Sequence, residues 1–440
     1  MISGDYARIG YMISHLTHTP KTTRIPQAPR KFYFLEYFYI LLKGVSTSNQ
    51  AEKIFDYFLE LKHQYRLGES KYKKLTEDSH ESTNQMARYR YTFDQVVSEA
   101  TDYKLISINN GEIELTSEGR DALQIYETKG TIEFNHYLFQ LMEEKHHEPF
   151  RYLIETCYKV NAKKSGLLIF PIYSAYRLGI ERDSLKASKD IKKYFQTLQN
   201  RIEEDISKHL GKNISLKKEN NDLIQKIAEE GLLPTSDSQA FDPKKYNTIL
   251  RRSRDFWLKY FLQTLYEYQI SLDSFEIWAY RAKQIGLLHI TEFYPDPSFY
   301  GKVVYPLSVI KTVSKSESFQ MFYEYRDASK LYLHQPSWKN ENTQEEFVQS
   351  LHQAYLDVRQ LAKTYFVSLP NVKERVCYAM KIPEYLFDQF LSQAYNNKRL
   401  RISISLEVDK LPDETKVMYL RREPVMVDGK YRNIIAIDLA

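Results

Sequence analysis

The stretch Leu105–Arg120, with the sequence LISINNGEIELTSEGR, carries the clearest local signal in the chain. Two short runs of alternating residues, LISI and EIEL, stand on either side of NNG. Asn110-Gly111 between such runs is typical of a type I′ β-hairpin, because both central residues of that turn need a positive φ. Thr116 or Ser117 then opens a helix. The stretch therefore predicts a small hairpin followed by a helix.

Three helices are expected ahead of this hairpin. They are predicted over Phe32–Leu42, over Gln50–Leu67 and from Thr83 onwards, from apolar residues at helical spacing. Three helices followed by a two-stranded hairpin is the order of a winged helix-turn-helix, with the hairpin as its wing and the third helix as its recognition helix. Asn, Gln and Arg pair with base edges, although winged helices also bind proteins. The candidate DNA-contacting residues on this helix are Asn84, Gln85, Arg88 and Tyr91.

The same order of elements recurs after residue 244. A helix is predicted over Leu250–Tyr268, and a second from Ser271 or Asp273 to Gln284, with Gly286 suited to its C-terminal cap. β-like runs follow at Leu287–Phe293 and Lys302–Tyr305. The candidate DNA-contacting residues of this second module are Arg251, Arg252, Tyr280, Arg281, Gln284 and, on its wing, Lys302.

A third set of such elements lies at the C-terminus. Short helices are predicted over Val372–Met380 and from Pro383 to about Tyr395, and strict alternation over Arg399–Leu406 predicts a strand. Further strands are predicted at Val417–Leu420 and Tyr431–Ile437. The second helix carries Glu384, Asp388 and Gln389, and carboxylates suit a phosphate surface poorly. We therefore expect this module to contact protein.

The N-terminal segment Tyr6–Leu35 is basic and contains no acidic residue. It carries Arg24, Arg30 and Lys31, and its prolines favour an extended chain. Such a segment fits an arm along a phosphate backbone or in a minor groove. It equally fits a solvated tail or a strap across the protein's own surface, and both interpretations stay open.

Composition bounds the class of protein. The chain has 440 residues, of which 42% are hydrophobic and 27% charged, as in globular proteins. Its formal net charge of +5 permits a nucleic-acid partner without requiring one. GxxxxGK[ST] and GxGxxG are absent, which argues against P-loop and Rossmann sites. No apolar run has membrane length and no signal-peptide core is present, so we expect a cytoplasmic protein without a membrane partner.

The residues that carry chemistry are sparse. Cys157 and Cys377 lie far apart, which excludes a zinc ribbon and a disulfide framework. His146, His147 and Glu148, with Glu143 and Glu144 nearby, do not match HExxH, and we expect a solvated helix end there. Neither a (D/E)xK nuclease run nor a nucleophile elbow is visible. The expectation is a protein that is not an enzyme and binds no metal or cofactor.

Three consecutive stretches carry a resemblance to a known family. They are YKLISINNGEIELTSEGRDAL (Tyr103–Leu123), FNHYLFQLMEEKHHEPFRYL and LLIFPIYSAYRLGIERDSL. Over roughly Phe93–Leu185 the chain resembles the winged-helix DNA-recognition region of AlwI-type (FokI-like) restriction endonucleases. Those enzymes carry a nuclease domain after the recognition region, and no such domain is recognised here. The resemblance implies a recognition subunit whose nuclease or motor is a separate protein, and no catalytic residue of the family is carried over.

Together these patterns predict a mainly α protein with small β-hairpin wings, built of tandem winged helix-turn-helix modules joined by helical segments. The expected divisions are a basic arm (1–31), a first module (32–130), a helical linker region (131–232), a second module (244–310) and a third, C-terminal module (345–440). The expected function is that of a non-catalytic subunit of a bacterial restriction or anti-phage defence complex, which binds double-stranded DNA and partners a separate nuclease or ATPase. The alternatives are a protein–protein adaptor, a plasmid or phage replication initiator, and a nuclease with a divergent motif.

Overall fold

The computed structural model describes residues 25–65, 79–160, 166–169, 185–186, 190–233, 245–291, 302–306, 309–311, 322–326, 330–334, 341–380, 382–397, 399–400, 402–408, 425–428 and 430–439. Over these residues the protein is mainly helical, with small sheets in which all strand pairs but one are antiparallel. The expected mainly α fold with small sheets is confirmed at this level. None of the helices described combines the length and the hydropathy needed to span a bilayer.

The first unit, residues 36–129, contains the hairpin. It consists of α2 (Glu36–Thr47), α3 (Ala51–Tyr65), α4 (Ser79–Asp102), β1 (Ile106–Asn109), β2 (Glu112–Leu115) and α5 (Ser117–Lys129). Asn110 and Gly111 have φ angles of 52° and 84° between the paired strands, so the predicted Asn-Gly hairpin is confirmed. The segment between α2 and α3 pairs with β2 through a bridge from Gln50 to Glu112 and through a bond from the Ile113 amide to the Asn49 carbonyl (2.9 Å). The order across this small sheet is residues 49–50, then β2, then β1.

The start of α5 explains why TSEGR follows the hairpin. The Thr116 hydroxyl caps α5 by accepting a hydrogen bond from the Gly119 amide at 3.0 Å. A Cβ atom on Gly119 would lie 1.9 Å from the Leu105 carbonyl oxygen. Glycine is therefore required for α5 to pack against the chain at the start of the hairpin.

The second unit, residues 149–306, is built around a three-stranded sheet, and α6 (Thr131–Lys145) leads into it. Its elements are α7 (Pro149–Val160), β3 (Leu167–Ile169), α9 (Ile191–Leu210), α10 (Lys217–Glu229), α11 (Tyr246–Lys259), the π-helix η2 (Tyr260–Leu265), α12 (Leu272–Ile285), β4 (Leu288–Thr291) and β5 (Lys302–Pro306). β4 and β5 form the predicted antiparallel pair, and Gly286, with a φ of 84°, caps α12 as predicted. β3 pairs with the other side of β5, so the sheet order is β3-β5-β4. β3 lies in the region predicted to be a helical linker, so that region contributes to the second unit.

The third unit, residues 341–439, follows a small sheet that the sequence did not predict. That sheet holds β6 (Val309–Lys311), β7 (Phe322–Arg326) and β8 (Lys330–His334). The unit itself contains α13 (Glu341–Ala362), β9 (Val367–Ser368), α14 (Leu369–Met380), α15 (Glu384–Asn396), β10 (Ile402–Glu407), β11 (Val425–Val427), β12 (Lys430–Arg432) and β13 (Ile434–Leu439). Its main sheet has the order β10-β13-β9. The strand predicted at Val417–Leu420 lies outside the described residues.

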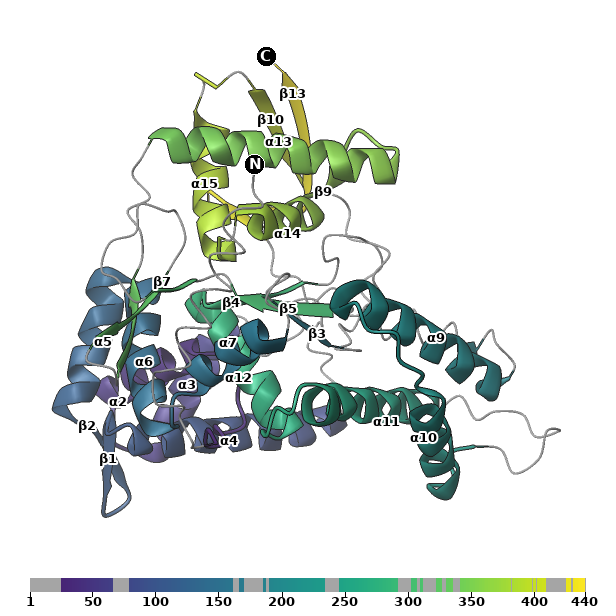
Figure 1. The fold of residues 1–440 in the computed structure, drawn as a ribbon. Coiled ribbons are helices and arrows are strands. Elements are labelled where there is room, and N and C mark those ends of the chain that lie inside the picture. Colours follow the sequence, from purple (N-terminus) through teal and green to yellow (C-terminus); the bar gives the residue numbers. More distant parts are fainter. Residues whose placement is uncertain are drawn as a thin grey trace.

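Among the residues described, the buried side chains form two separate cores. One runs from Phe32 to Leu288 and includes residues of both the first and the second unit. The other runs from Phe347 to Ile437 and belongs to the third unit alone. Figure 1 shows the third unit over the sheet of the second unit, with the β1–β2 hairpin projecting at the far end of the molecule. Thus the predicted third module has a core of its own, whereas the two modules predicted before it share one.

Candidate nucleic-acid interface

The exposed face of α4 is the part of the predicted interface that remains open to a partner. Arg88 is exposed, and Tyr91, one turn further along, is 50% exposed. Met86, beside them, is 47% exposed. The described residues offer Arg88 no carboxylate partner, whereas the neighbouring Arg90 is held by both oxygens of Glu52 at 2.8 and 2.9 Å. The backbone of Asn84 and Gln85 continues the same helix, but their side chains lie outside the described residues.

The hairpin beside α4 carries no basic side chain. Its strands present Glu112 and Glu114 to solvent, and Ile108 is 49% exposed. A wing with two exposed carboxylates repels phosphates, and an exposed isoleucine offers them nothing. Any contact of the first unit with DNA would therefore depend on α4.

The N-terminal segment lies across the protein's own surface where it is described. Pro26 and Pro29 are buried, and the Gln27 amide donates to the His146 carbonyl at 3.0 Å. Arg30 pairs with Asp102 at 2.9 Å and Lys31 with Asp273 at 3.4 Å. These contacts favour the strap over the phosphate-binding arm for residues 25–35. Arg24 lies outside the described residues.

Arg281 is not a surface residue, and its prediction as a DNA contact was wrong. Its side chain is fully buried and pairs with both oxygens of Glu99, at 2.7 and 2.8 Å. Its guanidinium also donates to the carbonyls of Arg30 and Phe32 and to the Met142 sulfur. Burial alone raises the pKa of Glu99, but the Arg281 charge and hydrogen bonds from Arg281, His146 and Tyr103 bring it to about 2. The pair is a structural ion pair that fastens the N-terminal segment and α4 to α12.

The remaining polar face of α12 is also covered by the protein itself. The Gln284 side chain accepts from the Leu35 amide at 2.9 Å and donates to the Tyr33 carbonyl at 2.8 Å. The Tyr280 ring packs edge-on against Tyr33, with centroids 5.3 Å apart. Glu276 pairs with Arg254 of α11, and Lys283 with Glu384 of α15 at 2.9 Å. α12 therefore does not present the predicted recognition face.

The other predicted contacts of the second unit are divided. Arg251 is exposed on α11, whereas Arg252 pairs with Glu230 at 2.7 Å. Lys302 begins β5, the central strand of the sheet, and its side chain lies outside the described residues. Among the described contacts, none links these residues of the second unit to Arg88 or Tyr91.

The acidic face predicted on α15 meets other parts of the same chain. Glu384 contacts Lys283 and His289 of the second unit and Lys373 of α14, while Asp388 accepts from Lys373 at 2.8 Å. Burial alone raises the pKa of Glu384, but Lys283, Lys373 and His289 hold it well below its ordinary range. These carboxylates are therefore used within the chain, and the expected contact of this module with a partner protein stays a prediction.

The His/Glu cluster at the end of α6 was expected to be a solvated helix end, and the structure shows that it is not. Glu143 and His146 are buried, and Glu143 accepts hydrogen bonds from the Phe150 amide at 2.8 Å and the Arg151 amide at 3.4 Å. These bonds cap the N-terminus of α7. Burial raises the pKa of Glu143 to about 8. No group of three or more possible metal ligands occurs among the residues described.

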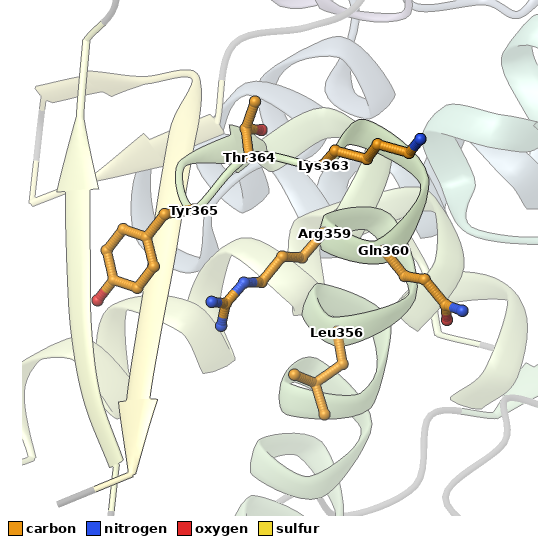
Figure 2. A pocket seen from close by; sticks show the side chains of 6 residues that line it. All are labelled: Leu356, Arg359, Gln360, Lys363, Thr364 and Tyr365. Atoms are coloured by element: carbon orange, nitrogen blue, oxygen red, sulfur yellow. The ribbon is translucent and has the colours of Figure 1, made fainter.

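Sequence reasoning missed a hollow at the C-terminal end of α13. Figure 2 shows the side chains that line it, which are Leu356, Arg359, Gln360, Lys363, Thr364 and Tyr365. The one signal available in the sequence was a run of apolar residues, Tyr365-Phe366-Val367, directly after a charged helix end. That run was not distinguishable from a buried strand. Comparison with known proteins adds nothing to these sites, since no family model, curated protein or solved structure matches the chain.

Proposed function

We propose that this protein binds double-stranded DNA through α4, as a non-catalytic subunit of a bacterial restriction or anti-phage defence complex. The supporting observation is an order of elements that occurs three times. In each unit a helix leads to a short strand, two helices and two further strands of the same sheet follow, and the last strand lies between the other two. In the third unit the separate β11–β12 pair is inserted before the last strand. This order supports the interpretation of each unit as a winged helix-turn-helix. In the second unit, α9 and α10 are inserted after the first strand.

The three strand orders carry this argument. They are residues 49–50, β2, β1 in the first unit, β3-β5-β4 in the second and β9-β13-β10 in the third. In each, the third helix (α4, α12 or α15) takes the place of a recognition helix. α12 is covered and α15 uses its carboxylates within the chain, so α4 supports DNA contact best.

The proposed contact is small. Arg88 can approach a guanine edge or a phosphate, and Tyr91 can stack on or hydrogen-bond to the backbone. The acidic hairpin limits the number of phosphates that the first unit can neutralise. We therefore expect affinity in the micromolar range, typical of binding that depends mainly on phosphates. Membership of a defence complex rests on the resemblance of Phe93–Leu185 to restriction-enzyme recognition regions.

Fluorescence anisotropy with a labelled duplex, over roughly 50 to 300 mM salt, tests the proposal. Arg88→Ala should weaken binding by about 1–2 kcal/mol and reduce the salt slope by about 1. Tyr91→Ala should weaken it without changing the slope. Arg399→Ala, at an exposed arginine of the third unit, is the matched control and should leave binding unchanged.

A protein–protein adaptor is the second candidate. The exposed carboxylates of the β1–β2 hairpin and the internal contacts of α12 and α15 favour it. Absence of duplex binding at 50 mM salt by a folded sample would support this candidate over the first. Mg²⁺ present in the same samples would reveal cleavage and so a divergent nuclease.

A further inference from the structure

The end of α13 and the turn into β9 expose an apolar surface with two cations. All residues from 359 to 366 are exposed. Leu361 is 60% exposed, Phe366 43%, Leu356 39% and Tyr365 38%. The opposite side of the helix, by contrast, is buried in the core of the third unit. We call this surface, residues 356–366, the α13 patch.

A shallow, open hollow of about 570 Å³ is part of this patch. Its wall is held in place, because the Tyr355 hydroxyl donates to the Tyr365 carbonyl at 2.9 Å and the Tyr365 hydroxyl bonds to Asp438. The Arg359 guanidinium lies 5.3 Å from the centroid of the Tyr365 ring. Figure 2 shows Arg359, Gln360 and Lys363 extending from the helix around this space. An aromatic wall beside an arginine is a frequent feature of protein interfaces.

The patch carries two cations, Arg359 and Lys363, and one carboxylate, Asp357, which faces Arg375 at 4.0 Å. Among the described residues, neither Arg359 nor Lys363 has a carboxylate within ion-pair distance. The dipole at the C-terminus of α13 favours cations at these positions. It gives no reason, however, to expose Leu356, Leu361 and Phe366 around them. Clustered apolar side chains on a surface mark an interaction site.

We propose that the α13 patch binds an acidic peptide segment of a partner protein that carries an apolar or aromatic anchor. The anchor would fill the hollow against Leu356 and Tyr365, and carboxylates would pair with Arg359 and Lys363. A nucleic acid fits less well, because phosphates gain nothing from the exposed leucines and phenylalanine. The α13 patch belongs to the third unit, whose core is separate from the core that α4 packs on. This inference therefore does not depend on DNA binding.

Panning a random short-peptide library on phage against the immobilised full-length chain tests the proposal. Enriched peptides should combine Glu or Asp with Phe, Leu or Trp. Arg359→Glu/Lys363→Glu and Leu361→Ser/Phe366→Ser should each weaken a synthetic copy of such a peptide by about tenfold or more. Lys192→Glu/Lys193→Glu, the same charge change on exposed lysines of α9, should leave it unchanged. Thermal melting checks that each variant folds, and Lys363→Glu alone serves if the double variant does not.

Three results would overturn the proposal. The first is that the wild-type chain enriches no acidic peptide over the charge-reversed variant. The second is that charge reversal weakens duplex DNA binding instead, which would assign the cations to nucleic acid. The third is a concentration-dependent dimer that Leu361→Ser/Phe366→Ser abolishes, which would assign the patch to a second copy of this chain.

Discussion

At the scale of single residues, burial decides the role of each charged group. Arg88 and Arg281 are both arginines on helices that follow a predicted turn, yet one is exposed and the other fully buried. The buried arginine is stable because Glu99, two backbone carbonyls and the Phe32 ring, 4.4 Å from its guanidinium, replace water around it. A charge in a protein interior requires such partners.

Removing one member of this pair should be costly. Arg281→Met should lower the free energy of unfolding by about 3–5 kcal/mol, because it leaves the Glu99 carboxylate buried without its counter-charge. Glu99→Gln/Arg281→Met should lower it by less than Arg281→Met alone, since no uncompensated charge then remains. Urea denaturation of the three proteins gives the comparison. Equal losses in the single and double variants would contradict a buried ion pair.

Glu143 should make stability depend on pH. Its folded-state pKa of about 8 lies above the ordinary value of 4.5, so its carboxyl is protonated in the folded protein at neutral pH. Its contribution is fully present below about pH 4.5 and is lost as the pH rises through about 8. Between pH 5 and pH 9 the wild type should lose about 4 kcal/mol relative to Glu143→Gln.

Chemical denaturation at several pH values measures that difference. Glutamine keeps an acceptor for the Phe150 amide and removes the titration, so other groups cancel in the comparison. A constant difference between the two proteins over this range would show that Glu143 has an ordinary pKa.

At the scale of elements, α12 is the central helix of the molecule. The N-terminal segment covers one of its sides through Gln27, Tyr33 and Leu35, and α6 and α7 pack on it as well. An amphipathic pattern predicts the helix but does not reveal how many neighbours cover it. α4 differs from α12 in this respect. The N-terminal segment crosses only the C-terminal half of α4, so it does not cover the N-terminal half of that helix.

The N-terminal segment should contribute to stability. A chain that begins at residue 32 should unfold with a free energy at least about 2 kcal/mol lower than one that begins at residue 25, because it lacks buried prolines and several hydrogen bonds. The Arg30 carbonyl that binds Arg281 would be lost with them. Equilibrium unfolding of both truncated proteins measures the effect. Equal stabilities would mean that these residues form no strap in solution.

At the scale of the whole molecule, two cores meet through a charged joint. Glu384 of the third unit contacts Lys283 and His289 of the second, and Tyr378 packs against the larger core. The separate core of the third unit means that it can fold as a unit of its own. The contacts of Glu384 and Tyr378 help to hold it against the rest of the chain.

Glu384→Gln should loosen this joint. It removes the negative charge that Lys283 and His289 contact on α15, whereas Lys373 keeps Asp388. We expect a loss of about 2 kcal/mol and two resolved transitions in scanning calorimetry. Gln389→Glu, on the exposed side of the same helix, is the control and should leave the wild-type profile unchanged. A single cooperative transition in Glu384→Gln would mean that other contacts hold the units together.

The sequence by itself determined the local elements. Asn110-Gly111 specified the hairpin because its turn needs positive φ, and Thr116 and Gly286 marked helix ends through capping. Apolar periodicity located most helices, and the core of the third unit falls within its predicted limits. These features depend on residues that are close in the sequence, so a single sequence is enough to predict them.

Only the tertiary structure decided which faces remain exposed. Arg281, Gln284 and Glu384 looked like surface groups because their partners lie far away in the sequence, on α4, the N-terminal segment and the second unit. β3 pairs with the edge of β5 that β4 leaves open. A short apolar run in the sequence does not show which strand it will pair with. Burial and pairing depend on such long-range contacts. For this reason the candidate DNA surface is limited to α4, and the α13 patch was identified only from the structure.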